Sequence, residues 1–418
     1  MRKAHRLMAV PVALAMMLAA CSSDSKNSSS GTTPAASQTT AAAATETTAA
    51  PAAETTAAAA AETTAAATDS TAAAAETPEA AGLARAQLVV DANTTPPDKI
   101  GPTIKLKSVP PKKTVAWLQC SLPSCAAIGV GFKNATDALG WKLDVISYDT
   151  DAAAAFQQAI DSKVDYVASS GTSQAVLQAQ IDAAKAAGIA YFSCYDTSEP
   201  KQDANNIWMQ CGDATAVIAS GDRLANQIIV DSGGKANVLM VNIPDFAVLI
   251  SEREGSKAAY KANCPGCKFT ELPLTLDQLL AGEVPGAIVA ALQADPSVDY
   301  VHFAFDGLTT GVTSVLKDAG LLEGRKLVGV DFSGAVLQEI VDGTMKFWSA
   351  NPKEYAAWLM VDAMARHSIG QDNTEERANA SLPSFIVSSP EQAKPLVAGD
   401  GWPGPATMAQ QFKTLWGV

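Results

Sequence analysis

Seven cysteines carry the most versatile chemistry in this chain. Cys120 and Cys125 flank Ser-Leu-Pro-Ser in the stretch WLQCSLPSC, and Cys264 and Cys267 form a Cys-Pro-Gly-Cys motif. Pairs of this kind can hold a metal, act as a redox couple, supply a nucleophile or form a structural disulfide. The choice among these roles depends on the compartment in which the chain folds and on the elements that carry the cysteines.

The N-terminus indicates an extracytoplasmic compartment. A basic start precedes an apolar run over residues 7–20 that is too short to cross a membrane, so residues 1–20 are expected to be a signal peptide. The run ends in Leu-Ala-Ala-Cys, which resembles a bacterial lipobox. This resemblance implies cleavage before Cys21, lipidation of its thiol and attachment to a membrane surface. The alternative is an ordinary signal in which Cys21 stands by chance.

Residues 21–99 are predicted to be a disordered stalk that begins at the lipidated cysteine. They consist mainly of Ala, Thr, Ser and Glu, with Glu-Thr-Thr-Ala-Ala recurring at Glu46, Glu54 and Glu62. Large apolar residues are almost absent before Leu83, so this stretch lacks the side chains needed for a core. We expect the stalk to hold a folded region away from the membrane.

The six cysteines after Cys21 are expected to form disulfides. Their number is even and they follow a secretion signal, which favours oxidation. A redox role for the Cys-Pro-Gly-Cys motif is the alternative, but the motif precedes a strand-like run rather than a helix start that would lower a thiol pKa. Other connectivities exist, and the simplest pairs sequence neighbours: Cys120 with Cys125, Cys194 with Cys211, and Cys264 with Cys267.

The composition argues against catalysis and against nucleic-acid binding. The net charge of −13 offers no basic surface for a nucleic acid. Beyond the signal the sequence holds only His302 and His367, which do not support a metal cluster or a Ser-His-Asp triad. Gly129 and Gly131 lack the third glycine of a dinucleotide-binding loop. We therefore expect no enzymatic activity, no metal and no cofactor.

Strand-like runs alternate with amphipathic helical segments from Thr114 onward, which predicts βαβ units and parallel sheets. The pattern restarts after a short extended connection over residues 206–212. We therefore expect an α/β protein with two doubly wound, Rossmann-like lobes joined by a hinge of short crossings. The predicted strands cover residues 113–120, 141–149, 164–171 and 189–196 in one half, and 236–245, 267–274, 299–306 and 326–334 in the other.

Two segments carry a resemblance to a known family. Residues 164–196 combine a strand, a helix, an Ala-Ala-Gly-Ile turn and a strand ending in Asp196, and residues 327–352 read LVGVDFSGAVLQEIVDGTMKFWSANP. Both resemble substrate-binding proteins of bacterial ABC transporters with the type I periplasmic fold of the ribose- and galactose-binding family. The resemblance spans residues 112–390. It implies a first lobe from residues 112–211 and 345–370, a second lobe from 212–344 and 380–390, and a C-terminal tail over 391–418.

The resemblance also implies a site between the lobes, at the carboxyl ends of the parallel strands. Aromatic faces and paired oxygen and nitrogen atoms would hold a sugar there. Cys120–Cys125 would close the loop after the first strand and hold two of these residues at the rim. The candidate ligand contacts at strand ends and crossings are Gln119, Ser121, Tyr195, Asp196, Phe246, Arg253, Phe305, Asp306, Asp331, Phe332, Trp348 and Asn351.

Several positions depart from the pattern of the family. Phe305 replaces an Asn that often precedes the aspartate, Thr197 stands in place of an Arg, and Ala350 in place of a Gln. Arg253 lies one residue closer to Gly255 than usual. The missing polar groups leave open a sugar held differently or a less polar solute, such as a nucleoside or an aromatic compound.

The predicted function is that of a monomeric, lipid-anchored and extracytoplasmic binding protein. It would capture a small solute, a sugar above all, between two closing lobes and deliver it to an ABC permease. The alternative function is a sensor module that presents a ligand-bound surface to a membrane receptor. No nucleic-acid partner is expected.

Overall fold

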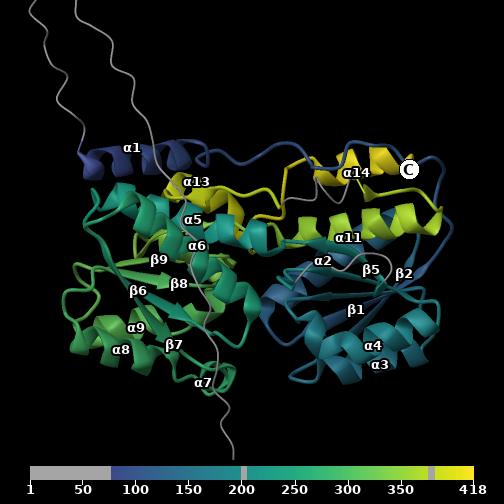
Figure 1. The fold of residues 1–418 in the computed structure, drawn as a ribbon, viewed down its shortest axis with the longest axis horizontal. Coiled ribbons are helices and arrows are strands. Elements are labelled where there is room, and N and C mark those ends of the chain that lie inside the picture. The colour runs from purple at the N-terminus through teal and green to yellow at the C-terminus, as the bar shows by residue number, and fades with distance from the viewer. Residues whose placement is uncertain (1–76, 199–204, 375–381) are drawn as a thin grey trace, which may run out of the picture. The chain divides into compact units, whose positions relative to one another are not determined.

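The computed structural model describes residues 77–198, 205–374 and 382–418 (Figure 1). The predicted signal peptide, the lipidation site Cys21 and most of the predicted stalk lie outside these ranges. Within them, no helix combines the length and the apolar character that crossing a bilayer requires.

The first lobe is built on a parallel sheet with the strand order β2-β1-β3-β4-β5. Its strands are β1 (Thr114–Cys120), β2 (Lys142–Tyr148), β3 (Tyr166–Ser170), β4 (Ala190–Cys194) and β5 (Ile207–Cys211). The connecting helices are α2 (Pro123–Leu139), α3 (Ala152–Asp161) and α4 (Gln174–Ala186). Strands β3 and β4 are almost entirely buried, as expected where helices cover both faces. The segment expected to be a mere connection at residues 206–212 is thus the edge strand β5.

The second lobe is built on a sheet with the order β11-β10-β9-β8-β6-β7, in which only the pairing of β10 with β11 is antiparallel. Its strands are β6 (Asn237–Asn242), β7 (Lys268–Pro273), β8 (Tyr300–Phe303), β9 (Lys326–Val330), β10 (Met345–Ser349) and β11 (Ile386–Val387). Its helices are α5 (Ala214–Asp231), α6 (Ala247–Asn263), α7 (Leu276–Leu280), α8 (Val284–Ala294), the 3-10 helix η2 (Asp306–Thr309), α9 (Val312–Asp318) and α10 (Gly334–Val341). Two parallel α/β lobes confirm the predicted fold class.

Two sequence-based boundaries need correction. The strand expected over residues 299–306 ends at Phe303, and Asp306 instead begins η2, which Gly311 with a left-handed φ of 75° separates from α9. Residues 345–349 were expected in the first lobe, but β10 pairs with β9 and so extends the second sheet. The chain crosses to the first lobe only after β10, where α11 (Lys353–Ser368) packs against α2.

The expected stalk contains a folded helix, α1 (Pro78–Asp91), that packs on α5 and α6 (Figure 1). Thr77 caps its start by accepting a hydrogen bond from the Ala80 amide. Ala86 is fully buried, and Arg85 Nε donates to Asn263 Oδ1 at 2.9 Å. The predicted stalk boundary at residue 99 is therefore wrong, since small side chains let this helix approach the second lobe closely.

The C-terminal tail packs on both lobes. Helix α13 (Pro390–Val397) lies against α10, and Trp402 packs edge-on against Phe385 at a centroid distance of 5.0 Å. Helix α14 (Met408–Trp416) lies against α11, where Trp416 stacks on Trp358 at 5.3 Å. The two aromatic contacts fix the tail to the second and the first lobe, respectively.

The six cysteines of the folded region form disulfides between sequence neighbours, as predicted. Cys120–Cys125 joins the end of β1 to the first turn of α2, and Cys194–Cys211 joins the carboxyl ends of β4 and β5. Cys264–Cys267 closes the turn from α6 into β7. Each disulfide thus stabilises the end of a strand or a helix.

Candidate functional site

A cavity of about 370 Å³ lies between the two lobes, and we call it the interlobe cavity. Residues at or just after the carboxyl ends of β1 to β5 form one wall, and residues that follow β6 to β10 form the other. Open parallel sheets place ligand sites at this end of their strands. The volume falls in the range of about 300–1,000 Å³ typical of small-molecule sites.

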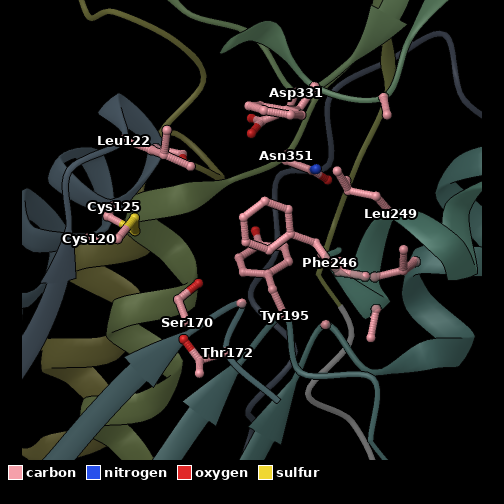
Figure 2. Close-up of a pocket in the computed structure, with 18 of the residues that line it drawn as sticks. Cys120, Leu122, Cys125, Ser170, Thr172, Tyr195, Phe246, Leu249, Asp331 and Asn351 are labelled. Atoms are coloured by element: carbon pink, nitrogen blue, oxygen red, sulfur yellow. A yellow bond between two sulfur atoms is a disulfide. The ribbon is translucent and has the colours of Figure 1, made fainter. Parts of the chain in front are cut away.

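The wall formed by the first lobe is polar at the ends of β2 and β3. Ser170 and Thr172 extend toward the cavity, and the hydroxyl of Thr172 lies 3.3 Å from that of Tyr148 (Figure 2). The Cys120–Cys125 disulfide and Leu122 lie beside them at the start of α2. The disulfide therefore lines the cavity itself.

Tyr195 and Asp331 reach the cavity through an uncommon backbone conformation. Tyr195 follows β4 with a φ of 54°, and Asp331 follows β9 with a φ of 61°. This left-handed region is strained for a bulky side chain, and such strain is often found at functional sites. The two residues come from different lobes, and both side chains point into the interlobe cavity (Figure 2).

The wall formed by the second lobe is mainly apolar. Phe246 precedes α6 and extends toward the middle of the cavity, as Tyr195 does from the opposite lobe (Figure 2). Phe305 follows β8, and Leu249 and Leu280 complete the surface. Aromatic side chains from both lobes therefore face the same interlobe cavity.

Lys353 connects two buried aspartates beside the crossing from β10 to α11. Its Nζ lies 3.0 Å from Asp331 Oδ1 and 4.0 Å from Asp306 Oδ2. Burial opposes the charged ammonium, but Asp331 and Asp306 outweigh burial and raise the pKa of Lys353. Burial also raises the pKa of Asp331 to about 6, with Lys353 opposing this shift and Asp306 adding to it. The two aspartates therefore keep Lys353 charged, whereas burial disfavours the charge of Asp331.

Arg223 is a cavity residue that the sequence reasoning missed. It lies on α5 with Ala216 and Ser220, and the spacing of four and three residues puts all three on one helix face. Its Nε donates to Ser349 Oγ at 3.2 Å. Burial lowers the pKa of Arg223 to about 10, with a smaller opposing effect of Asp222, so the guanidinium stays charged at neutral pH.

Glu252 is a second missed cavity residue, and it is paired with His302. Glu252 Oε1 lies 3.1 Å from His302 Nε2, and both side chains are almost fully buried. Burial raises the pKa of Glu252 well above its usual range and lowers the pKa of His302 to about 3. Both groups are therefore favoured in their neutral forms.

The structure brings half of the predicted ligand contacts together. The residues that line the interlobe cavity are Ser121, Tyr195, Phe246, Phe305, Asp331 and Asn351. Each of these residues follows a strand rather than lying within it. The backbone conformation after the strand therefore directs its side chain toward the cavity.

Three predicted contacts belong to the packed interior instead. Gln119 points from β1 toward Gly129 of α2. Trp348 is fully buried in the second lobe and stacks on Phe303 at 6.0 Å. Phe332 is also buried in the core of that lobe. Side chains alternate between the two faces of a strand, so a position near a strand end does not suffice for a cavity contact.

Three further predicted contacts are held by local partners away from the cavity wall. Arg253 forms ion pairs with Glu254 at 2.8 Å and with Glu271 at 3.1 Å. Asp196 is 2% exposed, and its Oδ1 accepts a hydrogen bond from the Ser198 amide at 3.0 Å. Asp306 begins η2 and faces Lys353 rather than the cavity. These placements correct the sequence-based expectation.

Metal ligands do not gather in the described part of the chain, where no group of three or more His, Cys, Asp or Glu side chains could hold an ion. The interlobe cavity itself presents aromatic faces, hydroxyls, an amide and a few charged groups.

Two parallel α/β lobes around one interlobe cavity define a two-lobed ligand-binding protein. The family described as "Periplasmic binding protein domain" matches residues 120–372, and the chain belongs to this family. A comparison with curated protein sequences finds no match.

Solved structures share the fold at low sequence identity. A sugar ABC transporter from Yersinia enterocolitica subsp. enterocolitica 8081 has a TM-score of 0.60 and 18% identity, covering 76% of this chain and 99% of that one. A carbohydrate transporter from Acidothermus cellulolyticus 11B in complex with myo-inositol has a TM-score of 0.56 and 22% identity, covering 69% and 98%. A solute binding protein from Agrobacterium vitis bound with alpha-D-tagatopyranose has a TM-score of 0.58 and 18% identity, covering 70% and 99%.

Proposed function

We propose that this protein is the solute-binding component of an ABC importer and that it captures a sugar in the interlobe cavity. The observation that carries the proposal is the convergence of strand ends from both sheets on one interlobe cavity with aromatic and polar walls. The sugars named for the structures from Acidothermus cellulolyticus and Agrobacterium vitis support the same class of ligand.

The cavity offers the groups that sugar recognition needs. Tyr195 and Phe246 can pack against the apolar faces of a ring, and Asp331 and Asn351 can bond its hydroxyls. Because the walls belong to different lobes, a bound sugar contacts both and stabilises their closed arrangement. The closed form would then dock on a permease.

The same proposal includes where the protein acts. Residues 1–20 direct secretion, Cys21 carries a lipid anchor, and the residues from Ser22 to about Thr77 act as the stalk. The disulfides of the folded region support an oxidising compartment. The protein acts there as a monomer that delivers its solute to the membrane.

Isothermal titration of the purified protein against a panel of monosaccharides and polyols tests the proposal. We expect one class to bind and to raise the melting temperature, because a ligand at about 100 times its Kd adds roughly 2.7 kcal/mol to the stability of the folded state. Phe246→Ala should weaken binding tenfold or more. Arg253→Ala is the matched control and should leave the affinity unchanged, since Arg253 does not line the cavity.

A less polar solute, such as a nucleoside, is the second candidate. The observation in its favour is the apolar surface that Leu122, Ile128, Val176, Leu249 and Leu280 add to the aromatic side chains. Nucleosides and aromatic acids in the same panel decide between the two candidates. Binding of a nucleoside without binding of any sugar would replace the sugar proposal.

A further inference from the structure

The interlobe cavity contains a cation that forms no ion pair with the residues that the structure describes. Arg223 and Lys353 are the cationic side chains on its described walls. Lys353 is ion-paired with Asp331 at 3.0 Å, whereas Arg223 forms no ion pair with any described residue. One positive charge of the cavity is therefore left without a carboxylate.

The position of Arg223 leaves room for an anionic partner. Its Nε is occupied by the neutral hydroxyl of Ser349, so the terminal nitrogens of the guanidinium remain for another acceptor. The side chain stays protonated although burial lowers its pKa to about 10. Arg223 is partly buried, and a cation that has lost part of its hydration gains from an anion or from hydrogen bonds that replace it.

The acidic residues around the cavity do not serve Arg223. Asp149 and Asp245 are exposed at the rim, and Asp245 accepts a hydrogen bond from the Leu276 amide. Asp331 is bound to Lys353, and Glu252 faces the neutral His302. Asp222 beside it opposes the effect of burial on the Arg223 pKa but forms no ion pair with it among the described residues. A solute can therefore supply the carboxylate that Arg223 lacks.

We infer that the solute carries a carboxylate that pairs with Arg223, so that the preferred ligand is a sugar acid rather than a neutral sugar. The inference rests on the proposed function and specifies its substrate class. A guanidinium binds a carboxylate through two parallel hydrogen bonds, which gives both strength and orientation. A phosphate ester shares the anionic chemistry but carries nearly two charges, whereas the described cavity walls hold one cation that forms no ion pair.

Calorimetric titration of the purified protein tests the inference. The ligands are several hexoses, each compared with its own uronic acid and its own 6-phosphate. We expect a uronic acid to bind at least tenfold more tightly than its parent hexose and than the phosphate ester. Arg223→Gln should remove this preference by weakening the acid tenfold or more while changing the hexose by less than threefold. Arg223→Lys should keep part of the preference, because the charge remains but the two-point geometry is lost.

Circular dichroism and a thermal melt establish whether each Arg223 variant folds. If Arg223→Gln does not fold, the affinities of Arg223→Lys for acid and hexose are compared with those of the wild type. Arg253→Gln removes a guanidinium outside the cavity and should leave both affinities unchanged. A hexose that binds as tightly as its acid would overturn the inference and leave the proposed function standing. Binding of the phosphate ester alone would also overturn it, and a panel in which no carbohydrate binds would remove the proposed function as well.

Discussion

Asp331 shows how one residue can combine a strained backbone with a costly charge. It holds a left-handed φ of 61°, its side chain is 14% exposed, and its carboxylate is bound to Lys353 at 3.0 Å. Burial nevertheless outweighs this ion pair, because the pKa of Asp331 is raised to about 6. Both features cost folding free energy at neutral pH, which is typical of a residue kept for ligand binding.

The Asp331→Asn variant should show this cost directly. Asn also tolerates a left-handed backbone, so the change removes the charge and keeps the turn. A carboxyl whose pKa is higher in the folded than in the unfolded chain stabilises the fold below its unfolded value, near pH 4, and this contribution is lost as pH rises to the folded pKa near 6. We expect wild type and variant to be similarly stable near pH 4, and the variant to be more stable by on the order of 1–3 kcal/mol above pH 6.

Denaturant unfolding of both proteins between pH 4 and 7.5 measures this difference. Comparing the two proteins removes the contributions of titrating groups that do not interact with Asp331, because these are common to both. A difference in stability that does not change with pH would contradict the raised pKa of Asp331.

Helices α5 and α6 form a close crossing in the second lobe, and glycine makes this crossing possible. A Cβ atom at Gly221 of α5 would overlap the backbone carbonyl of Glu252, and one at Gly255 of α6 would overlap that of Ile218. Ser256 Oγ donates to the Gly221 carbonyl at 3.1 Å across the same contact. Since α5 carries Arg223 and α6 carries Glu252, the crossing also sets the position of two cavity residues.

Gly221→Ala should therefore destabilise the protein by about 2 kcal/mol or more, because the overlap involves backbone that cannot rotate away. Gly286→Ala is a matched control in α8, where no atom lies within 4 Å of the added Cβ. It should be neutral or stabilise the protein by about 0.5–1 kcal/mol. Thermal and denaturant unfolding measure both variants, and equal effects would argue against a close crossing at Gly221.

Across the whole molecule, segments at both ends of the folded region connect the two lobes outside the cavity (Figure 1). At the N-terminal end, α1 packs on the second lobe, the Asn93 carbonyl accepts from the Ile386 amide at 2.8 Å, and the Leu106 amide donates to the Leu415 carbonyl near the first lobe at 2.9 Å. The C-terminal tail likewise runs from the second lobe, where α13 packs on α10, to the first lobe, where α14 packs on α11. The lobes are thus linked by more than their central crossings.

Removal of α1 should reduce the stability of the folded region. A chain that begins at Thr77 keeps the helix, whereas one that begins at Ala92 exposes the surface under Ala86 and Val90 and loses the hydrogen bonds of Arg85. We expect the longer chain to melt like the full protein and the shorter one to lose roughly 2–4 kcal/mol of unfolding free energy. If the full protein and both shortened chains melted at the same temperature, α1 would add no stability, and the predicted stalk boundary at residue 99 would stand.

The sequence was sufficient for the features that depend on local pattern. Short apolar runs between amphipathic helices predicted two parallel sheets, and parallel sheets place a site at their carboxyl ends. Disulfide pairing between sequence neighbours was predicted because the six cysteines are close in the chain and follow a secretion signal. The folded α1 was missed because its small side chains resemble those of the repetitive stretch before it.

The tertiary structure alone decided which side chains reach the cavity. Tyr195 and Asp331 do so because their φ angles turn them away from the sheet, whereas Gln119 and Trp348 lie within strands and point into packed layers. Arg223 reaches the cavity from a helix face whose orientation is set by the crossing of α5 and α6. A strand pattern determines where a site lies, but the direction of each side chain depends on turn dihedrals and helix packing that no local sequence signal contains.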